Sequence, residues 1–317
     1  MNNEKNYSII IPHKNIPKLL QRCLDSIPRR KDVQIIVVDD ASDPEIVNFE
    51  QFPGLNDPFV EVIFAKEGKS AGYARNIGLK RAVGKWLLFS DADDFFNYCI
   101  NDVLDEYANS DSDIVYFRHS CIDSDTYMTT PRAEAHNNRI RAWLHSSRKD
   151  DYPLRFINSS VWSKLFKTEL IKKNNIAFDE ISIAADITFS YLSGFYAASI
   201  SADLRALYCT TIRKGSIRHS KRSIEKILDI IFVESKRYRF FKDHNISVYK
   251  NIPLLKLLLK IYIKNKPHFN NAKKIISDFN ISYFDVIKIF IYDAILLAPK
   301  RMLGKFFLSK TNGKNKT

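Results

Sequence analysis

Aspartates gather directly after two apolar runs in the first hundred residues of this 317-residue chain. The runs are VQIIVV (33–38) and WLLFS (86–90), and the aspartates that follow them are Asp39, Asp40, Asp91, Asp93 and Asp94. Two aspartates two positions apart can share a hard divalent cation, because carboxylate oxygens are the ligands that Mg²⁺ and Mn²⁺ prefer. Such a cation needs an anionic partner, and a diphosphate is the simplest one.

Aspartates also cap helices and turns, and this structural alternative is favoured for each cluster taken singly. Together, after two successive apolar runs, the clusters favour a nucleotide site. The reason is that ligands of open α/β sheets bind beyond the carboxyl ends of the strands.

The elements that must position these aspartates alternate between strand and helix patterns. Apolar runs and helical spacing predict strands over 7–12, 33–40, 59–65 and 86–94, and helices over 16–27 and 71–84. This order predicts an α/β sheet that is at least partly parallel.

The rest of the chain is less regular at first and then helical. We expect a helix near 100–108, a strand over 112–120, and helices over 160–174 and 185–199. From about residue 221 onward the pattern is helical and basic, so we place a boundary between a first domain of residues 1–220 and a helical region of residues 221–317.

The composition suits a globular protein of the cytoplasm. The hydrophobic share is 45% and the charged share 27%, as is usual for soluble domains. The four cysteines form no C-x-x-C pair, which argues against a zinc ribbon or a disulfide scaffold and fits a reducing compartment. The N-terminus lacks the pattern of a cleaved signal peptide.

The net charge of +13 is unevenly distributed. Residues 211–317 hold 24 Lys and Arg against 7 Asp and Glu, whereas residues 1–210 hold 25 against 29. Such a basic region can meet nucleic acid, anionic lipid or a phosphorylated substrate, and charge alone does not choose among them.

Four segments carry a resemblance to a known family. They are YSIIIPHKN (7–15), VQIIVVDDASD (33–43), KSAGYARNIGLKRAVGKWLLFSDADD (69–94) and FDEISIAADITFS (178–190). In these segments the chain resembles a family 2 glycosyltransferase of the GT-A fold, the inverting type that uses nucleotide sugars. The resemblance spans about residues 5–220 and implies that DADD is the metal-binding element of such an enzyme.

The resemblance also implies roles for single residues at the nucleotide. Backbone around Pro12 and the carboxylates of Asp39 and Asp40 would hold uracil or another base, since an aspartate can accept a hydrogen bond from an imine N–H. Arg75 would approach the nucleotide or the diphosphate.

For the metal, the resemblance implies Mn²⁺ or Mg²⁺ bound mainly by Asp93, with Asp91 near the ribose or the metal. In IRKGSIRHS (212–220), Arg213 and Ser216 match residues that close over the diphosphate in similar enzymes. His219 would complete the metal shell, although a single histidine more often serves packing or faces solvent.

The proton acceptor of such a transfer is expected at Asp186. An inverting transfer needs a base that removes the proton of the acceptor hydroxyl, and similar enzymes keep a Glu-Asp pair there. Here Ala185 replaces the glutamate, so only the base position is retained. The structural alternative is that Asp186 is the N-cap of the helix that follows.

Trp162 and Lys164 in SVWSKLF are further candidates for ligand contact. Trp162 would stack on the acceptor sugar or pack against a helix, two alternatives that we weigh evenly. Lys164 is expected at the surface, with a phosphate contact as the alternative.

The segment 281–307 is rich in apolar and aromatic residues, and basic residues follow it. Its apolar runs are shorter than the roughly 20 residues needed to span a bilayer. The pattern favours contact with an anionic membrane surface, and the alternative is a helix packed on the rest of the protein.

We therefore expect an enzyme that moves a hexose or N-acetylhexosamine from a UDP-sugar to an oligosaccharide or lipid-linked acceptor in surface polysaccharide synthesis. The acceptor would place it peripherally on the inner face of the cell membrane. The alternatives are a nucleic-acid-binding protein and a nucleotidyltransferase. The first lacks a recognisable motif in the tail, and the second a glycine-rich phosphate loop after the first strand.

Overall fold

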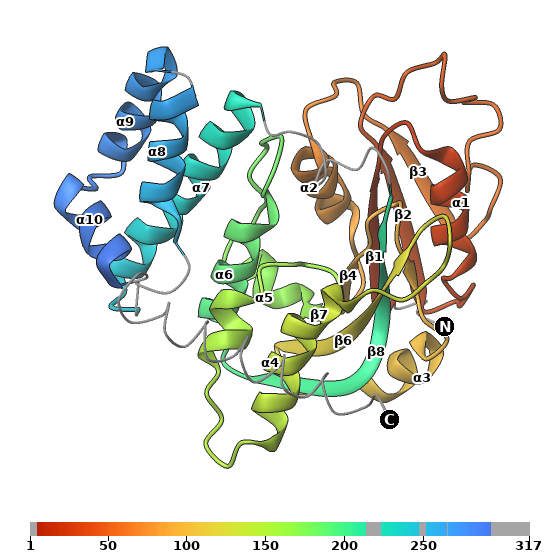
Figure 1. Cartoon of the computed structure of the whole chain (residues 1–317). Helices are drawn as coiled ribbons and strands as arrows, with labels where there is room; N and C mark the ends of the chain where they lie inside the picture. The colour runs from red at the N-terminus through yellow and green to blue at the C-terminus, as the bar shows by residue number, and fades with distance from the viewer. Residues whose placement is uncertain (1–4, 214–222, 247–251, 265, 293–317) are drawn as a thin grey trace, which may run out of the picture. The chain divides into compact units, whose positions relative to one another are not determined.

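The computed structural model describes residues 5–213, 223–246, 252–264 and 266–292. The chain divides into two compact units, Met1–Lys221 and Arg222–Thr317. The described strands all lie in the first unit, and the second unit is helical (Figure 1). The strands are β1 (Tyr7–His13), β2 (Val33–Asp39), β3 (Val60–Phe64), β4 (Trp86–Phe89), β5 (Phe95–Phe96), β6 (Ile114–Asp123), β7 (Lys164–Lys167) and β8 (Ile200–Ile212).

These strands form one mixed sheet in the order β3-β2-β1-β4-β7-β6-β8-β5. The helices of the first unit are α1 (Pro17–Asp25), α2 (Ala71–Arg81), α3 (Ile100–Tyr107), α4 (Glu134–His145), α5 (Thr168–Lys173) and α6 (Asp186–Tyr196), with short turns η1 (Pro131–Ala133) and η2 (Pro153–Ile157). The predicted α/β architecture is confirmed.

The N-terminal half of the sheet is parallel and is covered on both faces. β1 lies between β2 and β4 and is parallel to both, and β3 is parallel to β2. Ile9 and Ile11 point into one core with α1 and α3, whereas Ile10 points into a second core with α2 and α6. Figure 1 shows α1 and α2 on opposite sides of the sheet. Burial on both faces explains why these strands are continuous apolar runs.

The C-terminal half of the sheet differs from the sequence prediction. β7 pairs antiparallel with β4 and β6, so the helix expected over 160–174 is wrong except for Thr168–Lys173. Leu165 and Phe166 point into opposite cores, the alternation of a strand. β8 was not expected; it runs parallel to β6 and antiparallel to β5.

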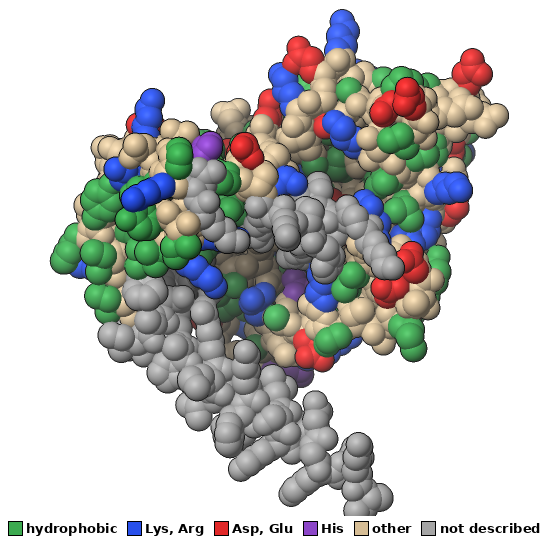
Figure 2. Space-filling view, turned by 45° about the horizontal axis from the view of Figure 1, so that its top comes forward, with side chains coloured by type: hydrophobic (Ala, Val, Ile, Leu, Met, Phe, Trp, Pro, Cys, Tyr) green, Lys and Arg blue, Asp and Glu red, His purple; other side chains and the backbone are tan. Residues whose placement is uncertain are grey.

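The second unit contains α7 (Ile224–Asp243), α8 (Leu254–Lys264), η3 (Lys266–His268), α9 (Phe269–Asp278) and α10 (Tyr283–Tyr292). The helical pattern expected from about residue 221 onward is confirmed for these segments. Figure 2 shows hydrophobic side chains over this unit with Lys and Arg side chains among them. Of the helices that the structure describes, none is both long and apolar enough to cross a bilayer.

Candidate active site

The register of the parallel strands brings the predicted nucleotide residues to one edge of the sheet. His13 lies opposite Asp39 at the carboxyl ends of β1 and β2, and Pro12 is buried one position earlier in β1. β4 ends at Phe89 on the other side of β1, so Asp91 follows at the same edge. Side chains that are far apart in the sequence thus surround the carboxyl ends of three neighbouring strands, where α/β sheets bind ligands.

Asp39 is turned into the protein and holds the loop that follows β2. Its carboxylate accepts hydrogen bonds from the backbone N–H and the hydroxyl of Ser42, at 2.9 and 2.6 Å. It also lies 2.7 Å from Nδ1 of His13, which donates because Nε2 of the same ring accepts from the Ile16 N–H. Burial alone would raise the pKa of Asp39, but these hydrogen bonds hold it below its ordinary value.

Asp40 has a different set of partners. One carboxylate oxygen accepts from the backbone N–H groups of Lys69 and Ser70, at 2.9 and 3.2 Å, and the other lies 3.5 Å from Nζ of Lys14. Ser70 is the N-cap of α2 and accepts a hydrogen bond from the N–H of Tyr73. Asp40 therefore ties the end of β2 to the start of α2. Asp39 and Asp40 are thus both held by protein donors at the edge where a base is expected.

Helix α2 connects the two sides of the site. Asn76 donates to the Phe178 carbonyl at 3.0 Å and accepts from the Phe178 N–H at 2.9 Å, so it clamps the chain just before Asp186. A Cβ added to Gly72 would lie 2.1 Å from the Asp179 carbonyl oxygen. The glycine is therefore what permits this close approach. The AGYARN motif thus serves packing as well as ligand contact.

Arg75 points from α2 toward the acidic loop after β4. Its guanidinium donates to the Asp91 carboxylate at 2.5 Å and lies over the ring of Phe178, 5.3 Å from its centroid. Its Nε is buried and has no hydrogen-bond partner among the described residues. The Asp91 side chain remains about one-third exposed, so a ligand can reach it.

Asp93 is paired with Arg213, whose Nε lies 2.9 Å from a carboxylate oxygen. The backbone carbonyl of Asp93 accepts from Arg22 and from the hydroxyl of Thr211, at 2.6 and 2.7 Å. Burial and then the charge of Asp91 raise the pKa of the Asp93 carboxyl, although Arg213 opposes this. The acidic loop is thus held in place by its backbone, and the Asp93 side chain is left for a cation or for Arg213.

Asp94 points inward and is separate from the other two aspartates of the cluster. It is almost fully buried and accepts a hydrogen bond from the Thr211 N–H at 2.6 Å. Burial, then the charges of Asp91 and Asp93, raise its pKa well above the ordinary value. Asp94 therefore joins the acidic loop to β8, which explains the third carboxylate of DADD without a ligand.

A divalent cation fits the residues that remain. Asp91 and Asp93 offer carboxylate oxygens. Burial first, and then the charge of Asp91, raise the pKa of Asp93, and a bound cation would offset that charge. Within the described ranges, no three His, Cys, Asp or Glu side chains are grouped as a metal site. The other ligands would then come from phosphate oxygens and water, which is common for Mg²⁺.

Asp186 is the first residue of α6. The N-cap of α6 is Ala185 and no side chain caps the helix, so the alternative that Asp186 is the N-cap is wrong. Burial raises the pKa of Asp186, Arg75 lowers it and Asp91 raises it. The charges of Arg75 and Asp91 therefore both act on this carboxylate.

Lys164 is buried, which corrects its expected surface position. Its ammonium donates to the Asn158 carbonyl at 2.7 Å and lies 5.0 Å from the ring centroid of Tyr116. Burial lowers its pKa to about 7, and the charge of Asp186 opposes this. The sequence carries no signal for this burial, because the pattern around Lys164 predicts a helix rather than a buried strand.

Trp162 belongs to an aromatic cluster. Its ring stacks on Tyr208 with centroids 5.7 Å apart and lies 4.5 Å from the ring of His119. The Tyr208 hydroxyl accepts a hydrogen bond from the Asp91 N–H at 2.8 Å. Burial lowers the pKa of His119 to about 3, so this ring is neutral. Trp162 is only partly buried, and both the packing and the sugar-stacking roles stay compatible with this position.

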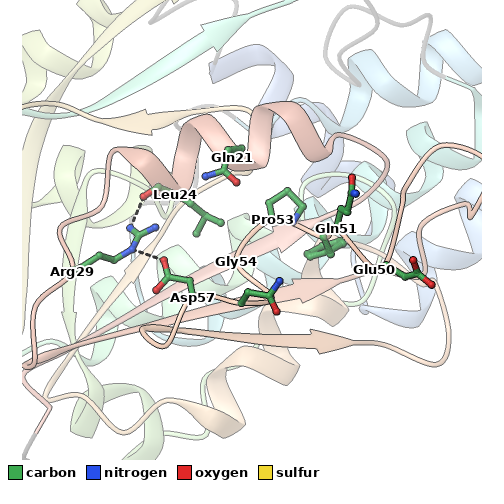
Figure 3. Close-up of a pocket in the computed structure, with 10 residues that line it drawn as sticks. Gln21, Leu24, Arg29, Glu50, Gln51, Pro53, Gly54 and Asp57 are labelled. Carbon is green, nitrogen blue, oxygen red and sulfur yellow. Dashed lines mark hydrogen bonds and ion pairs between the residues drawn. The ribbon is translucent and has the colours of Figure 1, made fainter.

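Two predicted site residues, Ser216 and His219, lie outside the described residues. A cavity of about 430 Å³ lies between α1 and the connection from β2 to β3, beside the ion pair of Arg29 and Asp57 (Figure 3). The residues that line this cavity include none of the predicted site residues.

The family is decided by a direct comparison of sequences. Residues 8–172 match the sequence model of Glycosyl transferase family 2. This chain belongs to that family. The match covers β1 to most of α5 and includes the aspartates at the strand ends, so the expected family is confirmed.

Two bacterial proteins illustrate the match. The chain is 32% identical over 198 residues to the uncharacterized glycosyltransferase EpsJ of Bacillus subtilis, which covers 60% of this chain and 56% of that protein. It is 28% identical over 203 residues to the cholesterol galactosyltransferase of Borreliella burgdorferi, which covers 60% of this chain and 55% of that protein. The alignments thus span little more than half the length of these relatives.

Solved structures show the same fold. Staphylococcus aureus TarS in complex with UDP-GlcNAc superposes with a TM-score of 0.62 at 21% identity, over 86% of this chain and 80% of that chain. The mannosyltransferase PcManGT of Pyrobaculum calidifontis, in complex with GDP-Man and Mn²⁺, gives a TM-score of 0.52 at 16% identity, over 94% and 82% of the two chains. The predicted GT-A fold is confirmed by the likeness to TarS.

Proposed function

We propose that this chain is a metal-dependent inverting glycosyltransferase that moves a hexose or an N-acetylhexosamine from a UDP-sugar to a glycan acceptor. The observation that carries this proposal is the convergence of Arg75, Asp91 and Asp186. Arg75 is hydrogen-bonded to Asp91, and both charges act on Asp186, although the three residues come from different elements.

In this mechanism Asp186 accepts a proton. The acceptor hydroxyl oxygen attacks the anomeric carbon while its proton moves to the Asp186 carboxylate. The bond from that carbon to the diphosphate oxygen breaks, and its electron pair stays on UDP. Attack from the face opposite the leaving group inverts the anomeric centre. The raised pKa of Asp186 suits this role, because a more basic carboxylate takes the proton more readily.

The leaving diphosphate meets cationic groups at the strand ends. Arg75 and Arg213 now neutralise Asp91 and Asp93, and both guanidinium groups are within reach of phosphate oxygens placed there. Mn²⁺ or Mg²⁺, held by Asp91 and Asp93, would act as a Lewis acid that offsets charge on the departing diphosphate. Asp40 and backbone near Pro12 would hold the base. Ser216 and His219, which follow Arg213 in the sequence, would close over the diphosphate and complete the metal shell.

The proposed donor and acceptor are supported by the relatives. TarS binds UDP-GlcNAc, and PcManGT binds GDP-Man with Mn²⁺. The named enzymes include a poly(ribitol-phosphate) beta-N-acetylglucosaminyltransferase and a cholesterol galactosyltransferase, which act on polymeric and lipid acceptors. We therefore propose an oligosaccharide or lipid-linked acceptor in surface polysaccharide synthesis, reached from the inner face of the cell membrane.

A screen of donor hydrolysis tests this proposal. The purified chain is incubated with UDP-, GDP- and dTDP-sugars, each with Mn²⁺, with Mg²⁺ and with EDTA. We expect hydrolysis of a UDP-hexose or UDP-N-acetylhexosamine that requires the cation and is lost in Asp93→Ala. Turnover of GDP- or dTDP-sugars alone would overturn the donor, and full activity in EDTA would overturn the metal.

A further inference from the structure

Helix α10 in the second unit presents an apolar side that has no partner among the described residues. Asp285 faces α7, where it lies 3.2 Å from Nζ of Lys242, and Val286 is buried. On the other side, Phe284, Ile287 and Ile291 are 65%, 47% and 47% exposed. Their spacing of three and four residues places them on one face of the helix. The only acidic residue described in α10 is thus used to fasten the helix, and apolar residues are left outside.

Exposed apolar residues continue on α8, which packs against α10. Leu259, Tyr262 and Ile263 are 47%, 47% and 78% exposed, although Leu258 and Ile261 next to them are buried. Large apolar side chains that cluster at a surface indicate an interaction site, whereas single ones do not.

Lysines accompany these apolar residues. Lys288 lies over the ring of Phe284 at 4.5 Å, and Lys266 lies over the ring of Tyr262 at 5.7 Å. The ammonium groups themselves lie over the aromatic rings as cation–π contacts, so positive charge stands directly beside the exposed apolar side chains.

A cationic hollow adjoins the apolar side of α10. A cavity of about 500 Å³ opens between α9 and the start of α10, and Tyr283, which is 59% exposed, lies at its edge beside Phe284. Its polar lining consists of Lys273, Lys274, Ser277, Asp278, Ser282 and Tyr283. Two lysines and several hydroxyl groups suit a phosphate oxygen, and Asp278 opposes it with one charge.

We propose that α8, α9 and α10 form a docking surface for an anionic lipid bilayer. Phe284, Ile287 and Ile291 enter the interface between headgroups and acyl chains, and Lys273, Lys274 and Lys288 meet the headgroup phosphates. This geometry is that of a monotopic contact, in which helices lie on the bilayer without crossing it. This surface would bring the enzyme to the bilayer that carries the proposed lipid-linked acceptor. Binding to the bilayer itself does not depend on glycosyl transfer.

Charge favours a bilayer over a second copy of this chain. Residues 254–292, which form this surface, hold 7 Lys and no Arg against 2 Asp and no Glu, so two such surfaces would repel each other. Nucleic acid would satisfy the lysines but would leave the apolar side of α10 in water. An anionic bilayer satisfies both sets of residues, because it offers phosphates above and hydrocarbon below.

Vesicle sedimentation of the full chain tests the proposal. Phosphatidylcholine vesicles are compared with mixed phosphatidylcholine–phosphatidylglycerol vesicles, without sugar donor. We expect binding to the mixed vesicles that weakens with added salt, since salt screens the lysines. Phe284→Ser with Ile287→Ser, and separately Lys273→Gln with Lys274→Gln, should each reduce partitioning by about tenfold or more.

Matched controls come from exposed residues of the first unit. Val83→Ser with Tyr98→Ser removes apolar side chains that are 66% and 97% exposed, and Lys18→Gln with Lys80→Gln removes two exposed charges. These controls should bind vesicles as the parent does. The substituted side chains are exposed, except for the half-buried Lys273, so circular dichroism should show an unchanged fold.

Several results would overturn the proposal. They are equal binding to neutral vesicles, α10 variants that bind like the parent, and a dimer that Phe284→Ser with Ile287→Ser dissociates while vesicles are not bound. Salt-sensitive binding of duplex DNA or RNA without vesicle binding would also overturn it. Because no donor is present, a failure of the proposed glycosyl transfer would leave these results unchanged, and the two proposals fail separately.

Discussion

Replacing Asp186 with Asn separates chemistry from structure at this site. Asp186 is the first residue of α6 and does not cap it, so Asn removes no capping hydrogen bond. What the helix loses is the interaction of one charge with the helix dipole, about 0.3–1 kcal/mol. The loss of a positioned base costs about 10²–10⁴-fold in rate, or about 3–5 kcal/mol of barrier. The two consequences differ enough to be measured on one purified protein.

The assay measures turnover with a UDP-sugar and an acceptor, UDP affinity by calorimetry, and thermal unfolding. We expect Asp186→Asn to lose at least a hundredfold in kcat and to keep its UDP affinity, because the diphosphate is expected at Asp91 and Asp93. Asp102→Asn is the matched control, since Asp102 also lies in the first turn of a helix, α3, and is exposed. It should keep parental turnover.

The pH dependence provides a second readout. A base acts only when it has lost its proton, and the pKa of Asp186 is raised. Turnover should therefore rise with pH through a pKa above that of an ordinary aspartate, and this rise should be absent from the residual rate of Asp186→Asn. A drop of less than tenfold with intact UDP binding would refute the reasoning and direct the search to Asp179 or Glu180.

Three further predictions concern the residues around the base. Asp93→Ala should abolish Mn²⁺-dependent UDP binding in calorimetry while the fold is kept, and unchanged affinity would contradict the metal assignment. Gly72→Ala should lower the melting temperature and the activity, since the added Cβ would lie 2.1 Å from the Asp179 carbonyl oxygen. Helix propensity alone would make the alanine variant more stable by about 1 kcal/mol, so a higher melting temperature would refute the contact. The pKa of Asp94 is raised, so the folded state loses stability as pH rises from the ordinary aspartate range through that pKa. Asp94→Asn keeps an acceptor for the Thr211 N–H and should be more stable than the parent protein at neutral pH without metal. This difference in stability should shrink in acid, and a melting-temperature difference that stays constant across pH would contradict the prediction.

The N-terminal half of the fold was predictable because its strands are buried on both faces. VQIIVV and WLLF carry apolar side chains at every position, a pattern that few other elements require. In the less regular part, Lys164 in KLFK has no such signal, and a strand of four residues with polar ends resembles one turn of a helix. Its burial follows from pairing with β4 and β6, which are far away in the sequence.

The sequence alone determined that Asp39, Asp40 and Asp91 directly follow apolar strand runs, and the register of β1, β2 and β4 then carries them to one edge of the sheet. It also determined that family 2 motifs accompany them. Only the tertiary structure decided what each carboxylate meets. The Asp39 carboxylate is hydrogen-bonded to His13 and Ser42. Asp94 accepts a hydrogen bond from Thr211 of β8, a strand that no local pattern predicted, and Asp93 pairs with Arg213. The physical reason is that periodicity along the chain reports which face of an element is buried, whereas the partner of a charge is set by residues that folding brings from elsewhere.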